Sequence, residues 1–421
     1  MVFSAKLSSE RLLQDSQYGF CGTTKDFCGD EKVIQPSCSG NSASQRVIGY
    51  YEGWSSSRAC RGLFPEDLLV TQYSHLNYAF AMIDPATFAI APMAELDKSL
   101  WPRFTALKKQ SPGLQTWISI GGWSMNDPDQ PTAKTFPQLA ASTDNQAKFF
   151  RSLVNFMSTY GFDGVDIDWE YPVAPERSGQ PADYQNYVSF LQNLKNALGQ
   201  GGHKYGLTLT LPSSYWYMQN FDIKGLEPLV DWFNLMTYDI HGTWDSSNPD
   251  IGPYVNAHTN LTEIQQTLDL LWRNKIDPGK VVMGTGFYGR SFTLTDPSCQ
   301  AAGCPFSAGG QPGPCTASAG TLSYAEIQDI VDGGSATVTE DQDAAVAIVT
   351  WDRDQWVSYD NANTLRKKME YANSKCLGGV MVWAASTDDA SGNAILALNG
   401  ASGRPNLSQA ALSLWPSTLV G

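Results

Sequence analysis

The amino-acid sequence predicts an α/β fold, a (β/α)8 TIM barrel with a small α+β insertion between its seventh and eighth strands. Eight strand-like runs alternate with helical patterns over about 340 residues, and polar and aromatic residues gather where the runs end. One connection, between the last two runs, is far too long for a βα loop. A chain of 421 residues has room for such a barrel and an insertion.

The runs are short and rich in β-branched and aromatic residues, which indicates strands. Apolar residues at three- and four-residue spacing between the runs indicate helices. The strand-like runs cover residues 46–51, 75–82, 115–120, 164–171, 207–211, 232–238, 281–287 and 379–383, and helix candidates include 146–160, 184–198, 261–274 and 363–374. We therefore expect a parallel barrel inside a layer of helices.

The long connection predicts a domain of its own. Residues of about 291–356 include a Gly-, Cys- and Pro-rich stretch, an amphipathic segment and an apolar strand candidate. This insertion should wall one side of the barrel mouth and favour exo-leaning or processive action. We assign 1–44 to a small cysteine-bearing segment ending in a linker, 45–400 to the barrel with its insertion, and 401–421 to a C-terminal tail.

The net charge of −14, with no basic cluster, makes nucleic acid and anionic membranes poor partners. No apolar run approaches the roughly 20 residues of a membrane span. The first residues lack a signal peptide core, yet the eight cysteines indicate an oxidising compartment. We therefore expect a secreted monomer whose N-terminus is truncated in this sequence.

The cysteine spacings leave the pairing open. Two sets are closely spaced and two cysteines flank the barrel, namely Cys21, Cys28 and Cys38, then Cys299, Cys304 and Cys315, with Cys60 and Cys376 apart. Zinc binding is the alternative to disulfides, but none of the four histidines lies near these thiols in sequence.

Three acids at every second position end the fourth run. Asp166, Asp168 and Glu170 alternate with apolar residues, so a strand sends the acids to one face and the apolar side chains to the other. Like charges at this spacing resist joint ionisation, so one carboxyl should stay protonated near neutral pH, as a general acid requires. Asp166, the deepest, should be tolerated only if hydroxyls such as those of Tyr50 and Ser119 surround it.

Two other interpretations of these acids remain open. One is a solvated, acidic edge strand. The other is a Mg²⁺ or Ca²⁺ site, although such sites collect ligands from several strands rather than one.

Aromatic residues lie at or just beyond the strand ends, where burial in the main core is not expected. They are Trp123, Tyr171, Trp216, Tyr238, Trp244, Tyr288 and Trp383. Flat aromatic faces along a groove suit the apolar faces of sugar rings, and polar rims suit their hydroxyls. Asp239 follows Tyr238 directly, and the pair could hydrogen-bond the oxygen and N–H of an amide. The pattern favours a carbohydrate-binding groove.

These motifs resemble the family 18 glycoside hydrolases, in particular fungal multi-modular chitinases. The resemblance covers about 46–400 and rests on Ser-Ile-Gly-Gly-Trp at 119–123, Asp-Gly-Val-Asp-Ile-Asp-Trp-Glu at 163–170, Met-Thr-Tyr-Asp at 236–239, Gly-Phe-Tyr-Gly-Arg at 286–290, and Trp383. It implies hydrolysis of the β-1,4 linkages between N-acetylglucosamine units of chitin and chito-oligosaccharides, with retention and without metal or cofactor.

The resemblance also implies roles. Glu170 would be the proton donor, and Asp168 would shuttle between Asp166 and the substrate's acetamido group, whose oxygen attacks to form an oxazolinium ion. Tyr238 would steady the acetamido carbonyl with Asp239 as its partner. The groove would be lined by Tyr50, Phe80, Ser119, Trp123, Tyr171, Trp216, Trp244, Tyr288 and Arg290, with Trp383 as its floor.

Residues 16–29 resemble the second half of a hevein-type chitin-binding module. Ser16, Tyr18, Phe20 and Phe27 match its sugar-contacting positions, but the first half and its cysteines are absent. So small a module cannot fold without its disulfides, so we expect no chitin binding by this segment.

Two other functions fit the same barrel. A chitin-binding lectin would typically lack the catalytic acid, and Glu170 is present. An enzyme that cuts the chitobiose core of N-glycans would differ in groove loops that the sequence does not resolve.

Overall fold

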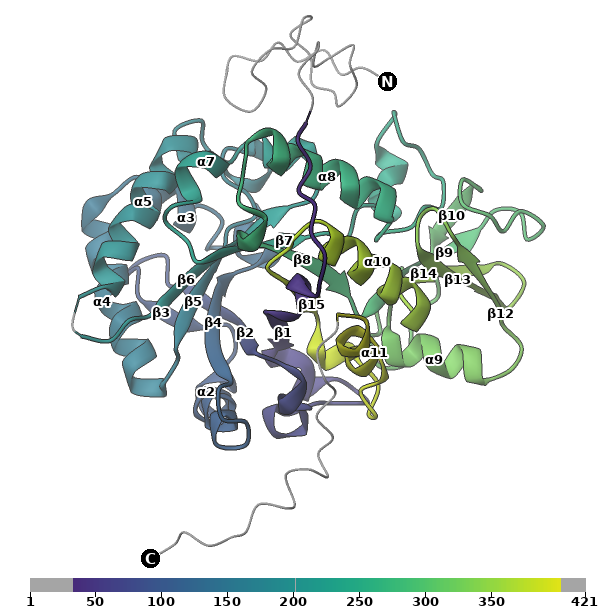
Figure 1. The fold of residues 1–421 in the computed structure, drawn as a ribbon, viewed down its shortest axis with the longest axis horizontal. Coiled ribbons are helices and arrows are strands. Elements are labelled where there is room, and N and C mark those ends of the chain that lie inside the picture. Colours follow the sequence, from purple (N-terminus) through teal and green to yellow (C-terminus); the bar gives the residue numbers. More distant parts are fainter. Residues whose placement is uncertain (1–32, 201, 403–421) are drawn as a thin grey trace, which may run out of the picture.

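A computed structural model describes residues 33–200 and 202–402, in which eight parallel strands close into a barrel (Figure 1). The order β1-β15-β8-β7-β6-β5-β4-β2 is completed by pairing of β1 with β2, and β3 (Ile90–Pro92) adds antiparallel to β2. The barrel strands are β1 (Val47–Glu52), β2 (His75–Ile83), β4 (Gln115–Gly121), β5 (Gly164–Asp168), β6 (Gly206–Pro212), β7 (Trp232–Met236), β8 (Val281–Gly286) and β15 (Gly379–Trp383). Each predicted run overlaps one of these strands, so the barrel is confirmed.

Helices surround the barrel, and the four predicted ones are confirmed. These are α4 (Thr143–Tyr160), α5 (Asp183–Leu198), α8 (Leu261–Arg273) and α10 (Ala362–Ser374); the others are α2 (Asp97–Thr105), α3 (Thr135–Ala140), α6 (Tyr215–Met218), α7 (Ile223–Leu226), α9 (Tyr324–Asp332) and α11 (Asn393–Ser402). Helix α4 shows why they form. The Ser142 side chain caps its first turn, Phe149 and Leu153 bury its apolar face, and left-handed Gly161 ends it.

A second, antiparallel sheet lies between β8 and β15 and flanks the barrel beside α10 (Figure 1). Its order is β10-β9-β14-β13-β12, with β11 paired to β9 and helix α9 packed nearby. The strands are β9 (Tyr288–Leu294), β10 (Phe306–Gly309), β11 (Thr321–Ser323), β12 (Thr337–Asp341), β13 (Val346–Trp351) and β14 (Gln355–Tyr359). The sheet thus extends a few residues beyond the expected 291–356 at each end.

The second sheet has a hydrophobic cluster of its own. Phe292, Phe306 and Trp356 are buried in it together with Val255, which belongs to the loop between β7 and α8. A barrel loop therefore contributes to this cluster, which ties the second sheet to the mouth of the barrel.

Strand β5 is central, so the edge-strand interpretation of its acids is wrong. It pairs with β4 on one side and β6 on the other. Val165 and Ile167 are fully buried in the main core, and Trp169 stacks on Phe136 of α3 with ring centroids 5.3 Å apart. The alternation predicted from the sequence therefore leaves the acids on the inner face of the barrel.

Six cysteines form three disulfides, which rules out zinc for these thiols. The pairs are Cys38–Cys376, Cys60–Cys315 and Cys299–Cys304, while Cys21 and Cys28 lie outside the described residues. Cys38 therefore bonds a residue 338 positions away rather than its sequence neighbours.

The segment expected to be a linker at residues 39–44 is instead packed on the barrel. Ala43 is fully buried and its N–H donates to Asn373 Oδ1 at 2.9 Å, at the end of α10. The disulfide of Cys38 and this contact explain why a polar, Ser-rich stretch is ordered here.

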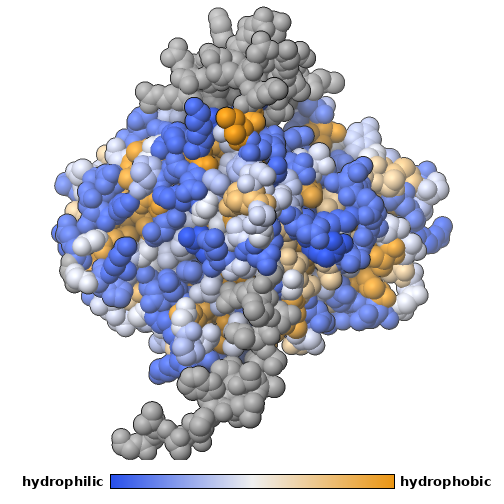
Figure 2. All heavy atoms as spheres, in the orientation of Figure 1, coloured by the Kyte–Doolittle hydropathy of each residue, from blue (hydrophilic) through white to orange (hydrophobic). Residues whose placement is uncertain are grey.

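The face of the molecule in Figure 2 is largely hydrophilic, with small, separate hydrophobic patches. Within residues 33–200 and 202–402, the helices are too short or too polar to span a lipid bilayer.

Candidate active site

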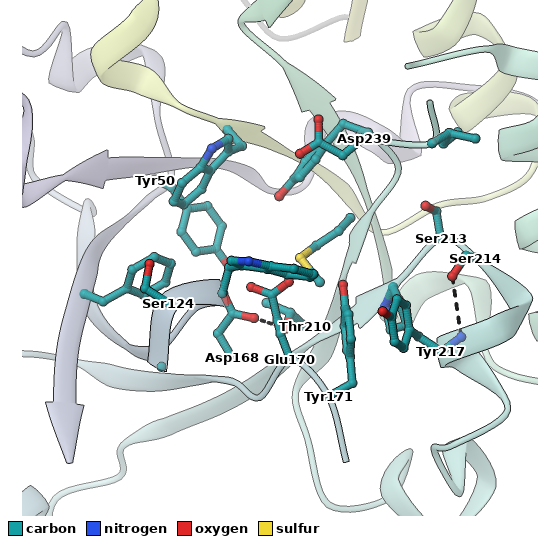
Figure 3. Close-up of a pocket in the computed structure, with 18 of the residues that line it drawn as sticks. Tyr50, Ser124, Asp168, Glu170, Tyr171, Thr210, Ser213, Ser214, Tyr217 and Asp239 are labelled. Carbon is teal, nitrogen blue, oxygen red and sulfur yellow. Dashed lines mark hydrogen bonds between the residues drawn. The ribbon is translucent and has the colours of Figure 1, made fainter. Parts of the chain in front are cut away.

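A pocket of about 770 Å³ opens at the C-terminal ends of the barrel strands, the usual place for catalysis in this architecture. Figure 3 shows Asp168, Glu170 and Thr210 close together, with Tyr171 and Tyr217 beside them. The predicted residues that line the pocket are Tyr50, Phe80, Trp123, Asp168, Glu170, Tyr171, Tyr238, Asp239, Trp244, Arg290 and Trp383.

Asp166 lies beneath the pocket, fully buried, with four hydrogen-bond donors around its carboxylate. Tyr50 Oη and Ser119 Oγ donate to Oδ2 at 2.7 and 2.8 Å, as expected from the sequence. Thr208 Oγ1 and Asn234 Nδ2 donate to Oδ1 at 2.8 and 3.0 Å. Burial raises the pKa of Asp166, and these four donors oppose that rise by stabilising the charged form.

Asp168 is one step nearer the pocket and also almost fully buried. Thr210 Oγ1 donates to its Oδ1 at 2.5 Å. Burial raises the pKa of Asp168 well above its ordinary value, and repulsion from Glu170 and Asp166 raises it further. This carboxyl therefore gains or loses a proton according to the charge of its two neighbours.

Glu170 follows the end of β5 and faces the pocket. Its burial raises its pKa from 4.5 to about 7, while the Arg177 guanidinium works in the opposite direction. A carboxyl with this pKa holds its proton over much of the neutral range and can deliver it to a bound group.

Two glycines let β4 end against the catalytic strand. Gly121 and Gly122 both have positive φ, and Gly122 N–H donates to the Asp168 carbonyl at 2.9 Å. A Cβ on Gly121 would lie 2.1 Å from that carbonyl oxygen, and one on Gly122 would lie 2.5 Å from the Phe80 ring. The Gly-Gly pair before Trp123 is therefore a steric requirement of the site.

Asp239, in the loop after β7, is bonded to two residues of β9 at the pocket rim. Arg290 Nε and Nη2 donate to its two oxygens at 2.8 and 2.7 Å, and Tyr288 Oη donates at 2.5 Å. Desolvation raises the pKa of Asp239, but Arg290 and His258 outweigh it and hold the pKa well below its usual range. Arg290 lies on β9, so the second sheet supplies one pocket residue.

Tyr238 has its hydroxyl 3.8 Å from Met381 Sδ, a weak acceptor. Its burial beside the acids raises the pKa of the phenol well above 10, which keeps the hydroxyl protonated. It can therefore donate a hydrogen bond to a stronger acceptor in the pocket.

The aromatic floor consists of Trp383, Phe80 and Tyr50. Trp383 stacks on Phe80 with centroids 5.6 Å apart and an interplanar angle of 22°, and Tyr50 lies 5.7 Å from it. Trp54 also stacks on Phe80, with ring centroids 6.1 Å apart. The result is a flat apolar surface suited to a sugar ring.

A buried arginine joins the segment that carries Trp123 and Asp127 to the end of the catalytic strand. Arg177 Nε donates to the Glu170 carbonyl at 3.0 Å, Nη1 donates to Asp127 at 2.7 Å, and Nη2 donates to the Trp123 carbonyl. Its guanidinium also lies 3.7 Å from the centroid of the Trp123 ring. Arg177 thus fixes an exposed aromatic platform relative to Glu170.

Some predicted residues lie elsewhere. Ser119, Asp166 and Tyr288 support the pocket from outside its lining. Trp216 is 59% exposed on α6, where its Nε1 donates to Glu176, and it does not line the pocket. The proposed module residues Ser16, Tyr18, Phe20 and Phe27 lie outside the described residues.

Sequence reasoning missed several supporting residues, namely Trp54, Arg177, Thr208, Thr210, Tyr217 and Asn234. A signal for two of them was present. Thr208 and Thr210 alternate with leucines on the strand after the acids, and the register places Thr208 opposite Asp166. The others lie on β7, on helix α6 or on short 3-10 helices in the loops, where spacing gives no such indication.

The acids are arranged for proton transfer rather than for a cation. Both Asp166 oxygens accept from donors, which leaves them poor metal ligands. Among the described residues no group of three or more His, Cys, Asp or Glu side chains is placed to hold a metal ion. A graded series results, with Asp166 surrounded by donors at the base, Asp168 next to it, and Glu170 facing the pocket.

Comparison with known proteins finds the model of "Glycosyl hydrolases family 18" matching residues 46–388. The "Secreted chitinase LysM12" of Penicillium expansum is 32% identical over 409 residues, which is 88% of this chain and 26% of that protein. The chain thus spans about a quarter of the length of that relative.

Two solved structures share the architecture. Catalytic domain 2 of the Ostrinia furnacalis Group II chitinase aligns with a TM-score of 0.76 at 27% identity, over 86% of this chain and 98% of that domain. Human YKL-39, described as a pseudo-chitinase with retained chitooligosaccharide binding, aligns with a TM-score of 0.74 at 25% identity, over 85% of this chain and 99% of that one.

Proposed function

The chain belongs to glycosyl hydrolase family 18, and we propose on this basis that it is a chitinase that hydrolyses β-1,4 linkages between N-acetylglucosamine units with retention. The observation that carries the proposal is Glu170, a buried carboxyl with a pKa of about 7 at the mouth of the barrel, beside a second carboxyl that responds to its charge.

The first step is leaving-group departure. Glu170 gives its proton to the glycosidic oxygen while the substrate's own acetamido oxygen bonds to the anomeric carbon, so the C–O bond breaks as an oxazolinium ring forms. No carboxylate on the protein needs to act as nucleophile. This suits a site where Asp166 is committed to four donors and Asp168 to Thr210.

Asp168 and Tyr238 manage the positive charge that develops on the acetamido group. Asp168 accepts a hydrogen bond from the acetamido N–H and stabilises the cation. Tyr238 donates a hydrogen bond from its hydroxyl to the acetamido oxygen before that oxygen attacks. In the second step Glu170, now ionised, takes a proton from water, whose oxygen adds to the anomeric carbon and reopens the ring. Two inversions at this carbon give net retention.

The aromatic residues supply binding and orientation. The sugar that reacts lies over Trp383, with Phe80 and Tyr50 supporting that floor. Asp239, held by Arg290 and Tyr288, offers its carboxylate to sugar hydroxyls at the rim. These contacts hold the acetamido oxygen close to the anomeric carbon. Holding the two reacting atoms in this geometry lowers the activation barrier of the first step.

A second candidate function is binding without hydrolysis, which the resemblance to YKL-39 raises. Glu170 in its buried setting favours the enzyme, because binding alone has no use for a carboxyl held protonated near neutral pH.

The test compares wild type with the Glu170→Gln variant, which keeps the shape of the side chain and removes its proton transfer. Chito-oligosaccharide release from chitohexaose should fall by at least about 10³-fold in the variant, while calorimetry should show binding retained. Equal release by both proteins, or none by wild type, would reject the chitinase proposal. The anomer released first, read by NMR, tests retention.

We also propose that the protein acts outside the cell, as a monomer, on chitin and its oligosaccharides. Three disulfides support an oxidising compartment. Exo-leaning or processive action remains a prediction, and an early product mixture of random-length oligomers would count against it.

A further inference from the structure

His241 is held between two carboxylates on different elements. Its Nδ1 lies 2.7 Å from Asp245 Oδ2 and its Nε2 lies 3.0 Å from Glu263 Oε1. With both ring nitrogens facing carboxylates, the geometry suits an imidazolium that donates in both directions. Burial lowers the pKa of His241, but its two hydrogen bonds outweigh this and raise it to about 9.

The two carboxylates differ in their surroundings. Asp245 is almost completely buried in the short helix η8 (Thr243–Ser247), whereas Glu263 is on the first turn of α8 and partly exposed. A buried carboxylate needs a partner, and His241 provides it for Asp245. The imidazolium therefore joins η8 to α8, a part of the barrel's outer layer.

Helix η8 carries Trp244, which lines the pocket and is 44% exposed. Its ring lies against the backbone of Gly242, where a Cβ would come within 2.3 Å of ring atoms. The Arg290 guanidinium lies 4.9 Å from its centroid. The Trp244 ring thus contacts Gly242 and has the Arg290 guanidinium over it, but its backbone depends on η8.

We propose that His241 is a positioning residue that binds Asp245 and Glu263 together, holds η8 on α8 and so fixes the Trp244 wall of the groove for an oligosaccharide chain. His241 itself does not line the pocket. The proposal rests on the function proposed above, since it takes the groove's ligand to be a chito-oligosaccharide. Loss of His241 should therefore weaken chain binding and leave proton transfer by Glu170 unchanged.

The test is a double-mutant cycle with chitohexaose. His241→Ala should raise KM about five- to tenfold, the loss that corresponds to roughly one ordinary hydrogen bond, with kcat within about twofold of wild type. Trp244→Ala should raise KM at least as much. The double variant should be no worse than Trp244→Ala alone, because His241 acts through Trp244.

Two further variants separate positioning from general stability. Gly242→Ala leaves His241 intact but pushes a methyl group into the Trp244 ring, so it should raise KM in the same way. His203→Ala removes an exposed histidine that precedes the N-terminal end of β6, away from the pocket lining, and should change nothing. Additive effects of His241→Ala and Trp244→Ala, or a lower melting temperature with unchanged KM, would overturn the proposal.

Binding of chitohexaose to the same variants, each made with Glu170→Gln, gives a readout that needs no catalysis. Kd should rise by the same factor as KM. If wild type shows no hydrolysis but Kd still depends on His241 through Trp244, the chitinase proposal fails and the positioning role stands. If wild type hydrolyses chitohexaose and His241→Ala leaves both KM and Kd unchanged, the positioning role is wrong and the chitinase proposal stands.

Discussion

The pKa of Glu170 makes a quantitative prediction about the pH dependence of catalysis. Burial raises this pKa from 4.5 to about 7, a change that corresponds to about 3 kcal/mol in favour of the protonated form. Glu170 must be protonated to release the leaving group. About nine-tenths of the molecules carry the proton at pH 6 and about one-tenth at pH 8, so kcat/KM should fall about tenfold between these values.

The perturbation that tests the origin of this pKa is Arg177→Met. The positive charge of Arg177 lowers the pKa of Glu170, so its removal should move the descending limb of kcat/KM to higher pH. Arg177→Lys keeps the charge and should leave the midpoint near that of wild type. Because Arg177 also holds the Trp123 loop, both variants should lose activity in absolute terms, and the midpoint rather than the height of the profile is the informative quantity.

The assay is initial-rate hydrolysis of chitotetraose from pH 5 to 9 at substrate concentrations well below KM, where the profile reports the free enzyme. Solvent exposure of Glu170 would instead give a midpoint near 4.5. A wild-type midpoint there, or a limb that Arg177→Met moves to lower pH, would refute the reasoning.

Three predictions concern stability. Asn234→Ala should lower the free energy of unfolding by ~1–3 kcal/mol in urea titrations, because Asp166 stays buried with one donor fewer. The control variant Asn196→Ala, on the exposed face of α5, should change the free energy of unfolding by less than about 0.5 kcal/mol. Equal effects of the two variants would contradict the four-donor arrangement. Cys38→Ser should cost ~2–5 kcal/mol because Cys38–Cys376 closes a loop of 338 residues, and an unchanged urea midpoint would show that this bond contributes nothing. His241 has its pKa raised in the fold from 6.5 to about 9, so its contribution to stability is complete below about pH 6.5 and is lost as the pH rises through 9. The stability difference between wild type and His241→Gln should therefore shrink by about 3 kcal/mol from pH 6 to pH 10, and a constant difference would show that the fold does not hold an imidazolium.

Much of the barrel and the centre of the site could be predicted from local patterns. The period-two alternation from Val165 to Glu170 gives the direction of each side chain, because successive residues of any strand point to opposite faces. The same logic predicted Tyr50 and Ser119 beside Asp166, since Ser119 lies on the adjacent strand β4 and Tyr50 reaches Asp166 from β1. Trp216 shows the limit of this reasoning, because a position past a strand end does not say which way a loop turns.

The sequence by itself determined the order of the eight β/α units and the alternation of the acids, because each depends on neighbours along the chain. The tertiary structure decided which distant residues meet. Asn234 reaches Asp166 from β7, Cys38 bonds Cys376, and Arg177 joins Trp123 to Glu170. These contacts depend on the register of a closed barrel and on the paths of its loops. Register and loop paths follow from packing the whole chain at once, so no local spacing encodes them.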